Sequence, residues 1–179
     1  VGLYIVVLVA MFGMYLYTYR RKLLYNLRHM LFFTILVALL IATAFIVLRH
    51  VAAGYIYLIP FAWVPIIARV FYDSRTAIFI HLITILIVSI AAPAPYVFVL
   101  LQVITGIVAV ISLRDMTQRA QLAQTALFVF LTYSIVYTAI TMLVTGDIMN
   151  VEYHYYIYFA INAVLVICAY GLIFLFERT

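Results

Sequence analysis

Charged side chains are scarce in this sequence of 179 residues. Only 8% of the residues are Asp, Glu, Lys or Arg, whereas 70% are hydrophobic, and the mean hydropathy is +1.29. Soluble domains are about half apolar and about one-quarter charged, so this composition excludes a water-soluble fold. The sequence therefore predicts an integral membrane protein.

Cysteine and catalytic motifs are nearly missing as well. Cys168 is the only cysteine, which excludes an intramolecular disulfide. None of the four histidines is followed by Asp, and the sequence has no HExxH, GxSxG, P-loop or CxxC motif. We therefore expect no catalytic residue, no bound cofactor and no metal site within these residues.

One minor alternative is a metal site at the outer surface. His50 and His154 are expected on the same side of the membrane as Asp147 and Glu152, and such ligands could hold zinc. Polar residues in exposed loops more often contact only water, so we rank this site below the interpretation without a metal.

What the sequence does contain is a succession of long apolar runs. Each can cross about 30 Å of hydrocarbon at ~1.5 Å per residue. The runs cover residues 2–19, 30–48, 55–71, 76–92, 96–113, 122–145 and 155–176. They predict one all-α domain over residues 1–179, a seven-transmembrane helix bundle. The first run lacks the features of a signal peptide, and we expect the chain to be a fragment of a larger protein.

Lys and Arg are divided unevenly between the two sides of this predicted bundle. Arg49 lies on one side, and the other side holds nine basic residues: Arg20, Arg21, Lys22, Arg28, Arg69, Arg75, Arg114, Arg119 and Arg178. Because basic residues in short loops are retained in the cytoplasm, we expect the N-terminus outside and the C-terminus in the cytoplasm.

The third and fourth runs, with the turn between them, form the centre of the predicted bundle. Pro60 and Pro65 are expected to kink the third helix, and neighbouring groups must then satisfy the freed carbonyls. Arg69, Asp73 and Arg75 form a cytoplasmic turn, in which Asp73 could cap the next helix and pair with either arginine. Fixing the angle between two helices is the simpler role of this turn, and coupling to a cytoplasmic domain is the functional one.

Three polar residues are expected inside the membrane: His81, Gln102 and Asn162. Polar groups at this depth tend to face the bundle interior and are candidates for sensing. Amides and hydroxyls also serve as modest links between helices, and we weigh that structural role as the commoner one.

Three stretches resemble the bacterial seven-transmembrane receptors that carry an intracellular HD-type phosphohydrolase, a group that includes cyclic-di-AMP phosphodiesterases. The stretches are IPFAWVPIIARVFYDSRTAIF (Ile59–Phe79), SLRDMTQRAQLAQTALFV (Ser112–Val129) and YGLIFLFERT (Tyr170–Thr179). The resemblance implies a sensor and signal-transducing domain in the bacterial cytoplasmic membrane. It also implies an extracellular domain before these residues and, after them, an HD domain that holds divalent metal ions and hydrolyses a cyclic dinucleotide.

The expected partners are therefore the lipid bilayer and these two flanking domains, without nucleic acid, and the arrangement is compatible with a homodimer. Two alternatives stay open. A rhodopsin or G-protein-coupled type of receptor has the same orientation, but Lys22 is the only lysine and cannot bind retinal from the last helix. A transporter or channel could use His81, Gln102 and Asn162, although no acidic residue lies inside a predicted span and no internal repeat is seen.

Overall fold

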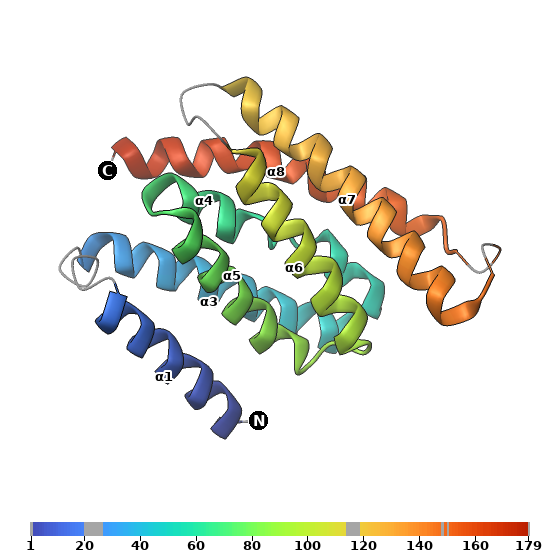
Figure 1. Cartoon of the computed structure of the whole chain (residues 1–179), viewed down its shortest axis with the longest axis horizontal. Coiled ribbons are helices and arrows are strands. Elements are labelled where there is room, and N and C mark those ends of the chain that lie inside the picture. Colours follow the sequence, from blue (N-terminus) through green and yellow to red (C-terminus); the bar gives the residue numbers. More distant parts are fainter. Residues whose placement is uncertain (1, 20–26, 114–118, 148, 150, 179) are drawn as a thin grey trace.

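The computed structural model describes residues 2–19, 27–113, 119–147, 149 and 151–178. The elements in chain order are α1 (Gly2–Tyr19), α3 (Leu27–His50), the 3₁₀-helix η1 (Ala53–Leu58), α4 (Trp63–Phe71), α5 (Ser74–Ser89), α6 (Pro95–Ser112), α7 (Arg119–Thr145) and α8 (His154–Arg178) (Figure 1). This part of the chain contains no strand, which confirms the prediction of an all-α protein.

Most of the helical segments have the length and composition of membrane spans. Five stretches within the described residues are long and apolar enough to cross a bilayer: Met30–His50, Gly54–Phe71, Pro95–Ser112, Gln121–Thr145 and His154–Phe174. Gly2–Tyr15 and Ser74–Ser89 are shorter apolar helices. The chain is therefore an all-α membrane protein.

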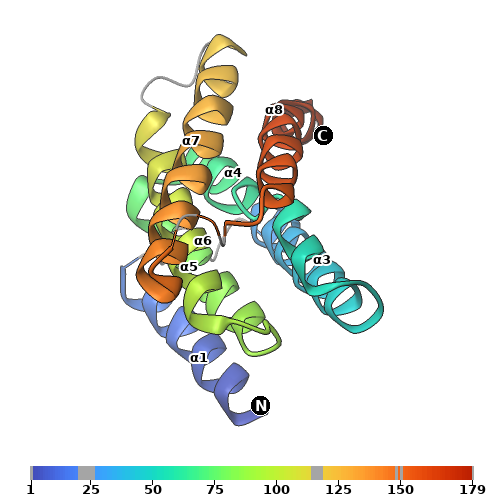
Figure 2. The same cartoon turned by 90° about the vertical axis from the view of Figure 1, so that its right-hand side faces the viewer.

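The helices form two layers with α4 between them. α5, α6 and α7 lie side by side in one layer, and α3 and α8 lie in the other (Figure 2). α4 contacts α5 and α6 on one side and α3 and α8 on the other, while α1 packs against α5. The shortest α-helix thus occupies the middle of the molecule.

The burial of α4 follows from its sequence, WVPIIARVF, which is apolar on every side except at Arg69. Val64, Ile66 and Ile67 have no exposed surface, and neither has Phe61 just before the helix. A helix that is hydrophobic all round is stable only when other elements enclose it. These residues form the centre of the main hydrophobic core.

The third run is broken rather than kinked, which corrects one expectation from the sequence. η1 ends at Leu58, Pro60 lies in the break, and Pro65 lies in the first turn of α4. Backbone N–H groups in the first turn of a helix have no partner within the helix, so the N–H that Pro65 lacks costs nothing there. Pro60 therefore marks a true interruption, whereas Pro65 does not bend α4.

Two other helix ends follow their local sequence. α6 begins at Pro95, one residue before the predicted run of residues 96–113, because proline is tolerated in a first helical turn. α7 ends at Thr145, and Gly146 follows with a φ of 71°, a left-handed conformation that glycine adopts without strain. The N–H of Gly146 donates to the carbonyl of Met142 at 2.9 Å and so satisfies a carbonyl of the last turn.

Many of the basic residues that predict the orientation lie wholly or partly outside the described part of the chain. Arg20, Arg21, Lys22 and Arg114 lie outside the described residues. The side chains of Arg28, Arg119 and Arg178 lie outside them as well, although these residues belong to α3, α7 and α8.

Candidate functional site

The break between η1 and α4 exposes backbone carbonyls inside the bundle, and Asn162 of α8 satisfies two of them. Its Nδ2 donates to the carbonyl oxygens of Tyr57 at 2.9 Å and of Ile59 at 3.0 Å. The Asn162 side chain is completely buried. Proline at position 60 removes one backbone donor, so these contacts supply the compensation that a broken helix needs in a bilayer.

A further hydrogen bond joins α8 to the start of α4, and here the acceptor is on α8. The indole Nε1 of Trp63, the first residue of α4, donates to the carbonyl of Leu165 at 2.8 Å. Leu165 follows Asn162 by three residues, and residues at that spacing lie on the same side of a helix. We call Asn162, Trp63 and the carbonyls they contact the α8 clamp, because it fixes the broken segment to α8 from both sides.

His81 makes a similar inter-helix contact between α5 and α6. Its Nε2 lies 2.9 Å from the carbonyl oxygen of Gln102, and the imidazole is 2% exposed. Gly106 leaves the room for this ring, because a Cβ at that position would overlap the imidazole. Nδ1 of His81 has no partner at hydrogen-bonding geometry, although the Phe61 carbonyl lies near the ring.

Gln102 extends the contacts from α6 to α7. The hydroxyl of Tyr133 donates to Gln102 Oε1 at 2.6 Å, and both side chains are fully buried. The Tyr133 ring stacks on Phe159 of α8, with ring centroids 5.0 Å apart and planes 9° apart. Phe159 precedes Asn162 by three residues, so Tyr133 reaches the part of α8 that carries the clamp.

The four buried residues His81, Gln102, Tyr133 and Asn162 therefore link α5, α6, α7, α8 and the broken segment in turn. We call them the buried polar chain. Three of them are the intramembrane polar residues that the sequence singles out. Tyr133 is not among those predictions. The sequence feature that could have identified it is its position in the middle of a span, away from the interfaces where tyrosine usually gathers.

Three of these side chains keep a buried polar atom without a partner in the described structure. The atoms are Nδ1 of His81, Nε2 of Gln102 and Oδ1 of Asn162. An unpaired buried polar group costs roughly 1–3 kcal/mol. The buried polar chain thus leaves one hydrogen-bonding atom unused on each of these three side chains.

The turn between α4 and α5 is tied to its neighbours in a way the sequence does not show. Asp73 occupies the N-cap position of α5 but makes no side-chain cap hydrogen bond. Its Oδ1 accepts a bond from the Thr76 hydroxyl at 2.6 Å, and the Tyr15 hydroxyl of α1 lies 3.2 Å from the same Thr76 oxygen. Tyr72 packs on Phe33 of α3, with ring centroids 5.0 Å apart.

Burial raises the pKa of Tyr72 to about 12, so its hydroxyl stays protonated at physiological pH. Nε of Arg69 has no hydrogen-bond partner within the described structure. The pairing of Asp73 with either arginine stays a prediction. The Thr76 hydroxyl is one partner of the Asp73 carboxylate, and the Tyr15 hydroxyl approaches Thr76 from α1.

The minor alternative of an outer metal site is also not formed. Among the described residues, which include His50, Asp147, Glu152 and His154, no three His, Cys, Asp or Glu side chains gather closely enough to hold a metal. His154 Nε2 instead lies 3.3 Å from the Glu152 carboxylate, and both side chains are exposed. This contact is a surface pair, and such pairs contribute little to stability.

The contacts described above position helices and carry no nucleophile or acid–base pair. A family model described as 7TM receptor with intracellular HD hydrolase matches residues 1–179 of this chain. Searches of curated proteins and of solved structures find no significant match.

Proposed function

Because the chain belongs to the family of 7TM receptors with an intracellular HD hydrolase, we propose that it is a transmembrane sensor and signal-transducing domain. It would regulate an HD-type hydrolase that follows these residues in the cytoplasm. The observation that carries this proposal is the α8 clamp, since it joins the broken centre of the bundle to the helix nearest the C-terminus.

We propose that the chain crosses the membrane seven times. η1 and α4 together make one apolar stretch, and with α1 and α5 the chain offers seven helical segments in succession. α1 and α5 have 18 and 16 residues, which is close to the lower limit of about 17 residues for a span. An odd number of crossings places the two termini on opposite sides of the membrane.

The positions of the helix ends agree with that proposal. The C-terminal end of α8, the α4–α5 turn and the C-terminal end of α1 lie at one end of the molecule (Figure 1). The N-terminal end of α1 and the α5–α6 connection lie at the other. The uneven distribution of Lys and Arg assigns the first end to the cytoplasm, which would bring α8 into the cell.

The mechanism that we infer is a shift between two packings of the helices. A signal at the outer end would favour one arrangement of η1, which contacts both α3 and α8. The α8 clamp would transmit that difference to α8, and α8 to the hydrolase. A signal can shift such an equilibrium only through a difference in its affinity for the two states.

The finer assignments follow from the resemblance of this chain to the cyclic-di-AMP phosphodiesterases of the family. We propose that the parent protein hydrolyses cyclic di-AMP in the bacterial cytoplasmic membrane, with divalent metal ions held by the HD domain. An extracellular domain before α1 would receive the signal, and Arg69, Asp73 and Arg75 would face the cytoplasmic domain from the α4–α5 turn. A homodimer is compatible with this arrangement.

Replacing Asn162 by leucine tests the proposal in the full-length protein. Asn162→Leu keeps a side chain branched at Cγ, although a larger one, and removes the amide that donates to the Tyr57 carbonyl. The Ile59 carbonyl loses one of its two donors and keeps the N–H of Phe61. We expect hydrolysis of cyclic di-AMP with Mn²⁺ to change by at least about fivefold, the lower end of ordinary coupling between sites.

The matched control is Ala160→Leu, which adds a leucine to an exposed position on the same helix and should leave the rate unchanged. The isolated HD domain gives the rate without regulation. If the full-length protein, its Asn162→Leu variant and the isolated HD domain all hydrolyse at one rate, these residues do not regulate the enzyme.

A further inference from the structure

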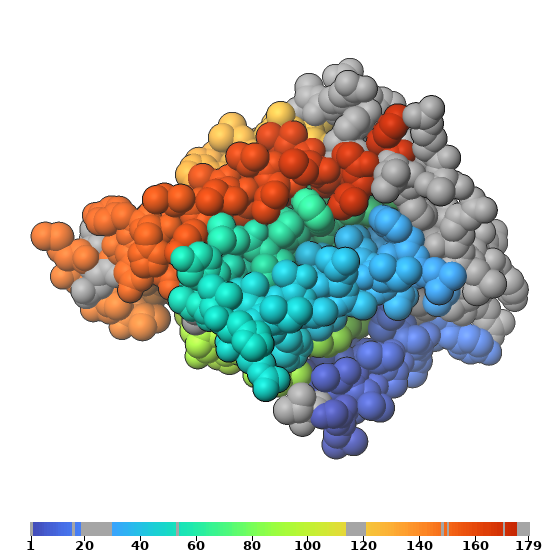
Figure 3. Space-filling view, turned by 180° about the vertical axis from the view of Figure 1, so that it is seen from behind, coloured from blue at the N-terminus to red at the C-terminus, as the bar shows by residue number. Residues whose placement is uncertain are grey.

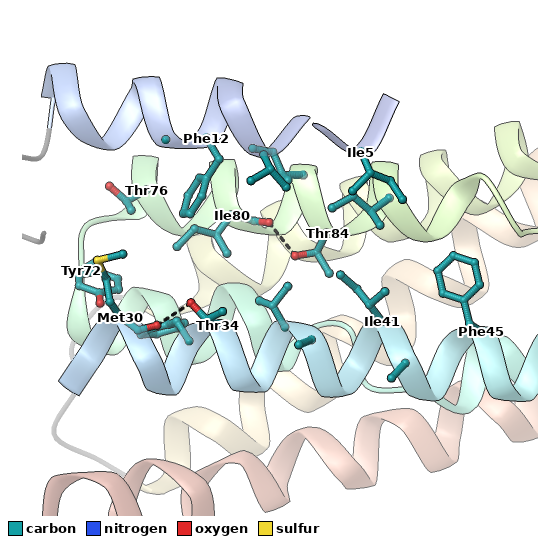
Figure 4. A pocket seen from close by; sticks show the side chains of 18 residues that line it. Ile5, Phe12, Met30, Thr34, Ile41, Phe45, Tyr72, Thr76, Ile80 and Thr84 are labelled. Atoms are coloured by element: carbon teal, nitrogen blue, oxygen red, sulfur yellow. Dashed lines mark hydrogen bonds between the residues drawn. The ribbon is translucent and has the colours of Figure 1, made fainter. Parts of the chain in front are cut away.

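An apolar groove of about 650 Å³ opens between α1, α3 and α5. α1 and α3 both pack against α5, and among the described residues their backbones do not come close to each other, so α5 forms the floor of the groove. Side chains such as Ile5, Phe12, Ile41 and Phe45 point into it from the two walls (Figure 4). α1 and α3 lie on the same face of the molecule (Figure 3).

The walls offer almost nothing to a polar ligand. The hydroxyls of Thr34 and Thr84 line the groove, but they donate to the carbonyls of Met30 and Ile80 in their own helices, each at 2.8 Å. The remaining lining between the groove ends is hydrocarbon. Cavities of this kind stay dry and take apolar molecules.

The length of the groove suits a hydrocarbon chain. It runs along α3 from Met30 to Phe45, which is about 22 Å at ~1.5 Å per residue. A linear acyl chain can lie along such a groove over its whole length.

The two ends of the groove differ in polarity. At one end Tyr72 and Thr76 line it, and Thr76 is bonded to Asp73 and lies beside the hydroxyl of Tyr15. Arg75 is exposed at the same end, directly before Thr76 in the chain. The other end, near Ile5 and Phe45, is apolar. A ligand with one polar end therefore fits in one orientation.

We propose that this groove binds one acyl chain of a membrane phospholipid, with the phosphate of the headgroup at the α4–α5 turn beside Arg75. Small residues keep the groove open, because Gly13, Ala38 and Ala42 contribute little volume to its walls. The bound chain fills a space that α1 and α3 leave between them, and it contacts Ile80 and Thr84 on the floor.

The bound acyl chain would press on α5, the helix that carries His81. His81 directly follows Ile80, so the groove and the His81–Gln102 contact lie on different faces of α5. Any regulatory effect of the lipid rests on the proposed function. Binding of the lipid does not rest on the proposed function, and the experiment therefore measures binding alone.

The probe is phosphatidylglycerol with a photoreactive diazirine on its acyl chain, present in vesicles that contain the full-length protein. After illumination, mass spectrometry locates the labelled peptides. We expect the label to concentrate on residues of the groove. Ala38→Phe together with Ala42→Phe should lower labelling there by about tenfold, because a filled groove has no volume left for the chain.

The control is Ala139→Phe, which enlarges an exposed residue of α7 away from the groove and should leave the labelling unchanged. Labelling that follows exposure over all helices, with no effect of filling the groove, would overturn the proposal. Disulfide-linked dimers of an Ala38→Cys variant in a Cys168→Ser background would overturn it too, because they would place a second copy of the chain in the groove.

Discussion

Gly106 and His81 show how a single missing side chain shapes the bundle. The imidazole occupies the space where a Cβ at position 106 would stand, and its Nε2 contacts the carbonyl of Gln102. The glycine is needed here for close approach, because a helix interior otherwise favours alanine. The contact between α5 and α6 therefore depends on both residues together.

Gly106→Ala should lower the free energy of unfolding by about 1–3 kcal/mol, because overpacking displaces the His81 ring. Removing the ring should restore most of the loss, so Gly106→Ala should be nearly harmless in a His81→Ala background. Thermal unfolding of the four proteins in detergent gives the coupling energy.

Gly171→Ala is the control, since nothing lies within 4 Å of a Cβ at that helical position. It should be neutral or should stabilise the protein by up to about 1 kcal/mol. Additive effects of Gly106→Ala and His81→Ala would show that the two side chains do not compete for one space.

The sequence located the polar residues of the core better than it located their partners. His81, Gln102 and Asn162 stand out because each interrupts an apolar run. Their partners are backbone carbonyls or one tyrosine among 16, which carry no such signal. The partners depend on how each helix is rotated about its axis, and runs that are apolar on all sides leave that rotation undetermined.

Among the helices, α4 shows that the two prolines of the third run have different roles, because Pro60 lies before the helix and Pro65 lies in its first turn. The sequence places both inside one apolar stretch, and nothing in it marks Trp63 as the start of a new helix. The Asn162 amide makes the break tolerable, and it lies about 100 residues later in the chain. The interruption could therefore not be predicted from the local sequence.

Pro65→Ala should change the free energy of unfolding by less than about 1 kcal/mol, because Pro65 lies in a first turn and acts mainly on the unfolded chain. Adding a proline two residues further along the helix, in Ile67→Pro, should cost about 3 kcal/mol or more. Thermal unfolding of both variants measures the difference. Equal losses would mean that α4 begins before Trp63.

For the whole molecule, the proposed seven crossings and their proposed direction can be tested with single cysteines in a Cys168→Ser background. Ala94→Cys and Tyr153→Cys, both at exposed positions, should react with a membrane-impermeant maleimide on intact cells. Arg75→Cys, also exposed, should react only after the membrane is opened, because the α4–α5 turn is assigned to the cytoplasm.

Ala139→Cys serves as the control for the bilayer interior and should remain unlabelled in both conditions, since its thiol would face hydrocarbon. The reverse pattern, with Arg75→Cys labelled on intact cells, would invert the bundle. The α8 end would then lie outside, where an intracellular enzyme could not receive its signal.

The enclosure of α4 also has a consequence for biosynthesis. The Gly54–Phe71 stretch is the least hydropathic of the five long spans, and it carries both prolines of the third run together with Arg69. The translocon releases apolar segments into lipid most readily, so we expect this one to be held back until later helices have emerged from the ribosome. Asn162 follows Ile59 by 103 residues, so the centre of the protein can be completed only after α8 has been made.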